Sequence, residues 1–337
     1  MAVEFNQLIA RNKRNSWLLV VLFTAFVVLV GLVIGYAFGL YAGDPRLAPY
    51  FAGACMLGAL VIAIVSATAS FYGGASAVLA MSRAREIRKP DDPQLFNVVE
   101  EMSLAAGVPM PRVYVIDDTA PNAFATGRDP AHAVVAITTG LRSKLKRDEL
   151  QGVIAHELSH VRNFDIRFAV LMATLVGVVV LMCDLFLRTL GWGRWGGGGR
   201  SSSRSSDDKG GNGLLMLVAF VVALLLSLIA PVLAKLIEMA FSRQREYLAD
   251  ASAVDLTRNP LGLASALGRI RDDPEVLEVA NRATAPMYIV HPIKRFEGRS
   301  SSIMDSHPPV EDRIKRLMQL AGPEEAMTND KARMTNE

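Results

Sequence analysis

An uncharged apolar run near the N-terminus places the strongest constraint on how this chain folds. Residues 17–40 read WLLVVLFTAFVVLVGLVIGYAFGL and contain no charged side chain. A helix rises about 1.5 Å per residue, so about 20 such residues cross a hydrocarbon core about 30 Å thick. The run therefore predicts a membrane-spanning helix. A cleaved signal peptide is the competing interpretation, but its apolar stretch would be only roughly 7 to 15 residues long.

Further apolar runs follow. Residues 51–72 again have spanning length and come after the short polar turn YAGDPRLAP, so residues 1–81 are expected to form an N-terminal segment and a membrane hairpin. Residues 214–234 are a good spanning candidate, whereas residues 168–183 are marginal and could instead be tilted, interfacial or buried. With the Gly/Ser-rich loop 191–213 they predict a second membrane hairpin over residues 168–237.

The placement of Lys and Arg indicates an orientation. If both hairpins return to the same side, that side carries most of the basic residues that flank the apolar runs. The positive-inside rule then places the N-terminus, residues of about 82–167 and the chain after about residue 238 in the cytoplasm. The basic residues of the Gly/Ser-rich loop argue mildly against this orientation.

Composition excludes several classes of protein. Hydrophobic residues make up 51% of the 337 residues and charged residues 20%, which is too apolar for an ordinary soluble protein. The net charge of +3 does not support nucleic-acid binding, and the apolar content excludes disorder throughout. The two cysteines, Cys55 and Cys183, lie in apolar runs, which excludes a disulfide scaffold or a Cys-rich zinc module.

The polar regions have the pattern of a mixed α and β domain. Residues 91–106 have helical spacing, and three short β-rich runs follow at residues 112–116, 122–126 and 132–138. Asp148 then opens another helix. We expect a mainly α, multi-pass membrane protein whose cytoplasmic α+β domain carries a small β-sheet. Its expected parts after the first hairpin are a catalytic region 82–167, the second hairpin 168–237, the rest of the catalytic domain 238–322 and a disordered tail 323–337.

An HExxH motif lies in the helix that follows Asp148. His156 and His160 stand four residues apart on one helical face, so both imidazoles can reach one Zn²⁺. Glu157 lies one residue round the helix, where it can take a proton from a water whose pKa zinc lowers from 15.7 to about 7. Chance supplies such a pattern in roughly one sequence of this kind in a few hundred. The motif therefore predicts zinc-dependent hydrolysis of peptide bonds.

A catalytic zinc site needs a third protein ligand, with the fourth position left for water. The extended motif HExxHxxGxxH is absent, because Asn163 and Ile166 stand where Gly and His are required. Glu246 is the better source, and Asp250 lies four residues further on the same helical face, where it can accept a hydrogen bond from the outer nitrogen of a liganding His. Asp165 and Asp250 are rival ligands, and an ion-paired surface beside neighbouring arginines is the alternative interpretation.

These segments together resemble the HtpX-type membrane zinc metalloproteases, relatives of the CAAX prenyl endopeptidases in the gluzincin group. The resemblance rests on HELSH followed by RN, on SRQREYLADASA and on SHPPVEDRIKRL, and it covers nearly the whole chain. It implies one Zn²⁺ per chain, a zincin-like fold, a cytoplasmic active site in the cell inner membrane, and a stress-related role in membrane-protein quality control. His156, His160 and Glu246 match the zinc ligands, and Glu157 matches the catalytic base.

Two further groups match that family less closely. His307 and Arg313 correspond to positions that face the zinc cleft in relatives, where they could stabilise an oxyanion, although a helix N-cap with an ion-paired Arg explains them equally well. Asn122, Ala123 and Phe124 belong to a strand whose edge could bind an extended substrate by main-chain hydrogen bonds. Asn122 follows a proline, so simple turn chemistry is the alternative.

The leading functional hypothesis is a zinc endopeptidase that cuts misfolded or damaged membrane proteins at the cytoplasmic face. Its partners would be unfolded or membrane-protein substrates and the lipid bilayer, with no nucleic acid. The alternative is a processing protease for one or a few membrane or prenylated substrates. A transporter is disfavoured, because transport usually requires ionisable groups within the spans and the sequence offers only Asp184 and Arg188 near one end of a span.

Overall fold

The structure, a computed structural model, describes residues 2–41, 44–175, 243–278, 287–290 and 308–321. Contacts between Cα atoms divide the chain into two compact units, which we describe separately. The Gly/Ser-rich loop 191–213, the expected span 214–234, His307 and the tail 323–337 all lie outside the described residues.

One unit comprises residues 16–70 and 174–236, and its first segment consists of a helical hairpin. Helix α1 (Ala2–Tyr41) and helix α2 (Ala48–Met81) are joined through a short 3₁₀ turn (Pro45–Leu47) that Asp44 caps through its side chain. Both helices contain stretches long and apolar enough to cross a membrane. Many of their Leu, Ile and Val side chains are exposed, as suits a lipid environment.

Small residues allow the two helices to approach closely. Gly31, Gly35 and Gly39 recur at four-residue spacing on α1, and each faces the backbone or a small side chain of α2. A Cβ atom added at Gly35 would lie 2.7 Å from Cβ of Cys55. This is the small-residue packing by which membrane helices associate.

The other unit comprises residues 1–15, 71–173 and 237–337, and it carries a four-stranded mixed sheet. The strands are β1 (Arg85–Glu86), β2 (Arg112–Ile116), β3 (Ala123–Gly127) and β4 (Ala133–Thr138), in the order β1-β2-β4-β3. Strands β2 and β4 pair in parallel, with Tyr114 opposite Ala136, and the other pairs are antiparallel. The three β-rich runs of the sequence thus form strands, and the two-residue β1 adds a fourth.

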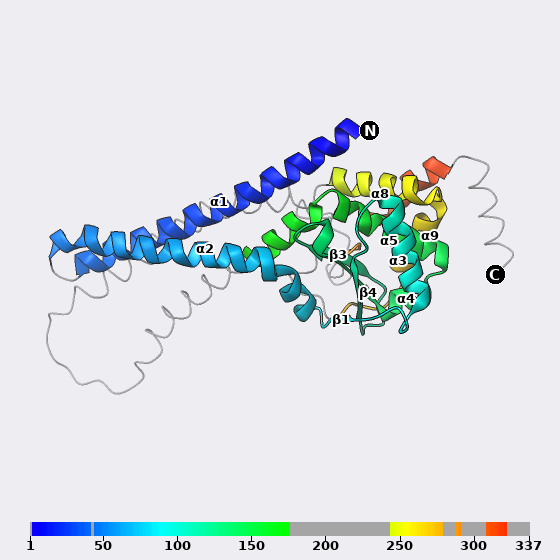
Figure 1. The fold of residues 1–337 in the computed structure, drawn as a ribbon, viewed down its shortest axis with the longest axis horizontal. Coiled ribbons are helices and arrows are strands. Elements are labelled where there is room, and N and C mark those ends of the chain that lie inside the picture. The colour runs from blue at the N-terminus through cyan, green and yellow to red at the C-terminus, as the bar shows by residue number, and fades with distance from the viewer. Residues whose placement is uncertain (1, 42–43, 176–242, 279–286, 291–307, 322–337) are drawn as a thin grey trace. The chain divides into compact units, whose positions relative to one another are not determined.

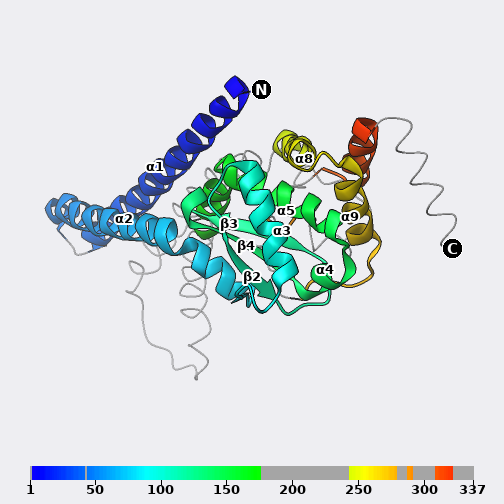
Figure 2. The ribbon, with the colours of Figure 1, turned by 45° about the vertical axis from the view of Figure 1, so that its right-hand side comes forward.

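Among the described residues, the helices that accompany the sheet (Figures 1 and 2) include α3 (Pro93–Ala106), α4 (Thr139–Lys144), α5 (Arg147–Arg162), α8 (Arg243–Thr257) and α9 (Pro260–Asp272). Residues 165–175 and 310–321 are also helical. Helix α5 is the central element, because it packs against α3, α8, α9 and strand β3. Its side chains Val153, Ile154 and Leu158 are fully buried in the main apolar core.

Glu149 fixes the start of α5 and ties it to α9. Its carboxylate accepts hydrogen bonds from the Lys146 backbone N–H at 2.8 Å, from Ser265 Oγ at 2.6 Å and from Arg269 Nε at 2.7 Å. Burial raises the pKa of Glu149, but these hydrogen bonds outweigh it and the net pKa is lowered. The Glu149 carboxylate is favourable near the N-terminus of α5, and the same group also anchors α9.

Gly152 permits the close approach of α5 and α9, and this generates a testable prediction. A Cβ atom at this position would lie 2.8 Å from the backbone nitrogen of Leu263, so Gly152→Ala should lower the free energy of unfolding by about 1–3 kcal/mol through overpacking. Gly268 in α9 has open space around it, so Gly268→Ala should raise that free energy by up to about 1 kcal/mol. Urea unfolding of the protein in detergent micelles measures both. Equal effects of the two substitutions would contradict the packing argument.

Candidate active site

Helix α5 presents two imidazoles to the same point in space. The Nε2 atoms of His156 and His160 lie 3.3 Å apart, and the two rings meet edge to face. This convergence follows from the four-residue spacing, which places both side chains on one face of a regular helix. Most of the surrounding α5 side chains are buried, so the helix is held in place on its other faces.

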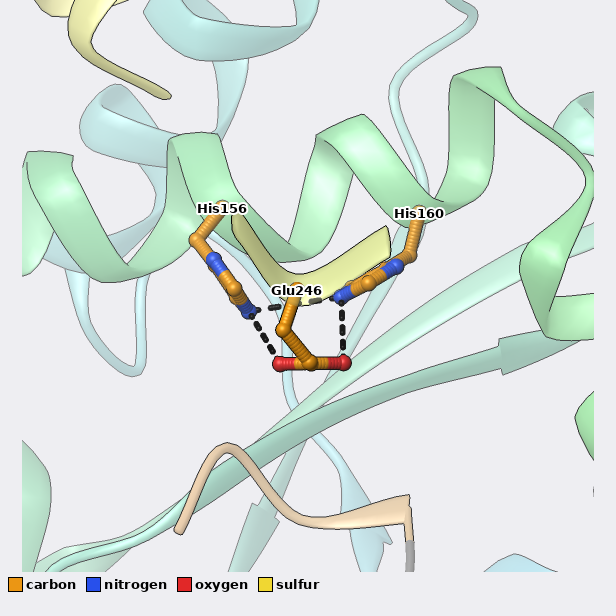
Figure 3. A group of neighbouring side chains, drawn as sticks. All are labelled: His156, His160 and Glu246. Carbon is orange, nitrogen blue, oxygen red and sulfur yellow. Dashed lines mark hydrogen bonds and ion pairs between the residues drawn. The ribbon is translucent and has the colours of Figure 1, made fainter. Parts of the chain in front are cut away.

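Glu246, in the first turn of α8, completes a group of three (Figure 3). Its two carboxylate oxygens lie 3.6 Å from His156 Nε2 and 3.6 Å from His160 Nε2. In a tetrahedral zinc site with bonds of about 2.0 to 2.2 Å, two ligand atoms are separated by about 3.3 to 3.6 Å. Two imidazole nitrogens and a carboxylate at these separations therefore fit a zinc ion. Of the rival residues, neither Asp165 nor Asp250 belongs to this group.

Asp250 orients His156 from one turn further along α8. Its Oδ1 lies 2.9 Å from Nδ1 of His156. Burial and the charge of Arg313 lower the pKa of His156, but the hydrogen bonds with Asp250 and Glu246 outweigh them and raise it to about 9. A proton held on Nδ1 by this carboxylate leaves Nε2 as the metal-binding atom. The sequence-based expectation for Asp250, a hydrogen bond to the outer nitrogen of a histidine, matches this geometry.

Asp165 makes the equivalent contact to His160. Its Oδ2 lies 2.9 Å from Nδ1 of His160, on the side of the ring away from the group of three. Burial lowers the pKa of His160, and the hydrogen bond with Asp165 together with the charge of Glu246 raises it overall. The sequence offered Asp165 only as a rival metal ligand. Its orienting contact was missed, because no local pattern shows that the chain turns back after α5.

Glu157 lies next to the metal-binding group without belonging to it. Glu157 is 3% exposed. Burial raises the pKa of Glu157, and the neighbouring imidazoles only partly oppose that rise. A carboxylate with a raised pKa beside a metal-binding group is suited to accept a proton near neutral pH.

Arg313 is buried inside the site and is held by Asp250. Its Nε and Nη2 donate to the two oxygens of Asp250 at 2.9 Å and 2.6 Å, and its Nη1 donates to the Ile289 carbonyl at 2.9 Å. Burial lowers the pKa of Arg313, but Asp250 more than compensates and raises it. The guanidinium thus contacts Asp250 and Ile289, and its Nη2 also lies 3.4 Å from both ring nitrogens of His156; the expected oxyanion role stays a prediction.

The strand edge expected to bind substrate contacts the chain's own residues 287–290. The Ile289 N–H donates to the Ala123 carbonyl at 2.9 Å, and the Asn122 side chain donates to the Val290 carbonyl at 2.9 Å. Phe124 is fully buried and packs edge to face on Tyr288. Substrate binding by Asn122, Ala123 and Phe124 stays a prediction, and it would require a different pairing at Ala123.

The buried pair of Arg313 and Asp250 generates a prediction about stability. Arg313 is 0% exposed, so Arg313→Met leaves Asp250 as a buried carboxylate without its guanidinium partner. Breaking such a pair costs about 3–5 kcal/mol. We expect that loss in urea unfolding of the metal-free protein, whereas exposed Lys315→Met should change stability by less than about 0.5 kcal/mol. A loss below about 1 kcal/mol for Arg313→Met would show that the pair is not a structural anchor.

Comparison with known proteins identifies the family. Residues 89–321 match the family described as Peptidase family M48. A protein named "Protease HtpX homolog" from Lactobacillus helveticus (strain DPC 4571) is 42% identical over 314 residues, covering 93% of this chain and 99% of the relative. A relative of the same name from Listeria monocytogenes serotype 4b (strain CLIP80459) is 44% identical over 311 residues, covering 92% and 97%.

The crystal structure of S. mikatae Ste24p is a further similar structure, with a TM-score of 0.45 and 20% identity; the similarity covers 92% of this chain and 66% of that one. The family assignment rests on the sequence matches alone, and it confirms the resemblance drawn from the motifs. The chain belongs to peptidase family M48 and is a metalloendopeptidase of the HtpX type.

Proposed function

We propose that this protein is a zinc-dependent membrane endopeptidase that hydrolyses peptide bonds of misfolded or damaged membrane proteins at the cytoplasmic face. One observation carries the chemistry: His156, His160 and Glu246 converge beside the buried carboxylate of Glu157. The two histidines and Glu246 would hold the metal. Bound zinc would act as a Lewis acid that polarises the peptide carbonyl.

Glu157 would act as the general base and acid. Its raised pKa suits a group that takes a proton from the attacking water. The same carboxyl can return that proton to the amine that leaves when the C–N bond breaks.

The membrane setting is supported by the two apolar helices and by the placement of basic residues. Arg11, Lys13 and Arg14 precede the first apolar run, and Arg83 and Arg85 follow the second. Both basic clusters belong to the unit that holds the active site. The positive-inside rule therefore favours a cytoplasmic site for this unit.

The assignment of Glu157 generates the central test. We expect Glu157→Gln to keep bound zinc at one ion per chain, because Glu157 is not in the metal-binding group, while cleavage of a denatured substrate falls by about 10²–10⁴-fold. Metal analysis of the purified protein and a proteolysis assay measure the two effects. Glu246→Gln is the matched control, since it should lose zinc and activity together. Undiminished proteolysis by Glu157→Gln would exclude the proposed mechanism.

The number of different substrates distinguishes a quality-control protease from a processing protease that acts on one or a few substrates. Cells that carry only the Glu157→Gln variant should accumulate many different membrane proteins if the enzyme removes damaged ones. Quantitative proteomics of their membranes, compared with cells that carry the wild type, measures this. Accumulation of one client, or of a few clients with a common modification, would favour the processing protease.

A further inference from the structure

Asn12 precedes the first apolar run and forms hydrogen bonds with the turn that carries Asp165, the residue that contacts His160. Its side chain is 2% exposed although it belongs to the basic N-terminal end of α1. Nδ2 of Asn12 donates to Oδ1 of Asp165 at 2.6 Å and to the backbone carbonyl of Asn163 at 2.9 Å. The other carboxylate oxygen of Asp165 contacts Nδ1 of His160. One chain of hydrogen bonds therefore leads from the N-terminal segment to a proposed zinc ligand.

The turn that carries Asp165 requires external support. Phe164 has a φ of 60°, a left-handed conformation that is unfavourable for a residue with a large side chain. This conformation reverses the chain after α5 and brings Asp165 back to His160. Asn12 holds the residues on both sides of Phe164, and the ammonium group of Lys13 lies 4.4 Å from the centre of the Phe164 ring. Two consecutive residues of α1 thus brace this turn.

Arg245 connects the same network to the third proposed ligand. Its Nη1 lies 3.3 Å from Oδ1 of Asn12 and 3.4 Å from Oδ1 of Asp165, and it immediately precedes Glu246 in the chain. The Asn12 amide therefore lies between the turn after α5 and the start of α8. These are the two segments that must be held together for His160 and Glu246 to share one metal.

We propose that Asn12 is a positioning residue for the metal centre, acting through Asp165 on the orientation of His160. This inference rests on the proposed zinc site. The N-terminal segment is then part of the catalytic apparatus as well as the start of a membrane helix. A role limited to helix packing is the competing explanation, and it predicts no effect on the metal itself.

The test uses the full chain in detergent micelles, loaded with Zn²⁺ or with Co²⁺ as a spectroscopic probe. Asn12→Leu removes the amide donors at similar volume, and Asn12→Asp keeps the shape but places a carboxylate against Asp165. Loss of the group bonded directly to a liganding His lowers metal affinity by about 10–100-fold; Asn12 acts one contact further out, so we expect both variants to lose zinc to a chelator faster, by up to about tenfold. The visible absorption of bound Co²⁺ should shift in both.

Asn15→Leu is the matched control. Asn15 is also buried, at 6% exposure, and lies one turn further along α1, with no described hydrogen bond to Asp165 or Arg245. It should release zinc at the wild-type rate. A second comparison places Asn12→Leu in an Asp165→Ala background, where the substitution should cause no further acceleration if it acts through Asp165.

Each outcome decides between the explanations. Wild-type zinc release and an unchanged Co²⁺ spectrum in both Asn12 variants would overturn the inference, as would an undiminished effect of Asn12→Leu in the Asp165→Ala background. Failure of the wild-type protein to bind zinc at all would instead overturn the proposed metal site. The two failures are therefore distinguishable.

Discussion

Two hydrogen bonds between imidazole Nδ1 atoms and carboxylates organise the active site. Asp250 makes this contact to His156, and Asp165 makes it to His160, each at 2.9 Å. A neutral imidazole carries one proton, so a carboxylate at Nδ1 leaves the lone pair on Nε2, the atom that faces the shared position. Without these carboxylates either ring could carry its proton on Nε2. The two Nε2 atoms, 3.3 Å apart, would then not both have a lone pair available for a metal ion.

The charges of the site explain why it suits a divalent cation. Among the described residues, six ionisable side chains surround the two histidines: the carboxylates of Glu157, Asp165, Glu246 and Asp250, and the guanidinium groups of Arg245 and Arg313. With all carboxylates ionised, these groups carry a net formal charge of −2 in a largely buried volume. In the metal-free state protons on the imidazoles offset this charge, in keeping with the pKa of His156 near 9 and the raised pKa of His160. A bound Zn²⁺ would replace those protons.

Sequence reasoning identified the parts of the site that depend on regular helix geometry. The spacing of His156 and His160 predicts their convergence, whereas the spacing of Glu246 and Asp250 places both on one helical face and leaves Asp250 a rival ligand. The sequence could not show the role of Asp165, because that role depends on a left-handed Phe164, a conformation for which the residue type gives no signal. It also could not show that Ile289 pairs with Ala123, because that contact joins segments far apart in the chain.

The contacts of Asn12 also constrain the topology of the membrane hairpin. A hydrogen bond of 2.6 Å to Asp165 keeps Asn12 on the same side of any bilayer as the metal-binding residues. The unit that contains both residues stops at Asn15 and resumes at Phe71. If residues 17–40 cross about 30 Å of hydrocarbon, the chain must therefore cross again before Phe71 to rejoin this unit. The apolar stretch of α2 has the length and composition for that return, so a first crossing by residues 17–40 would call for a second one by α2.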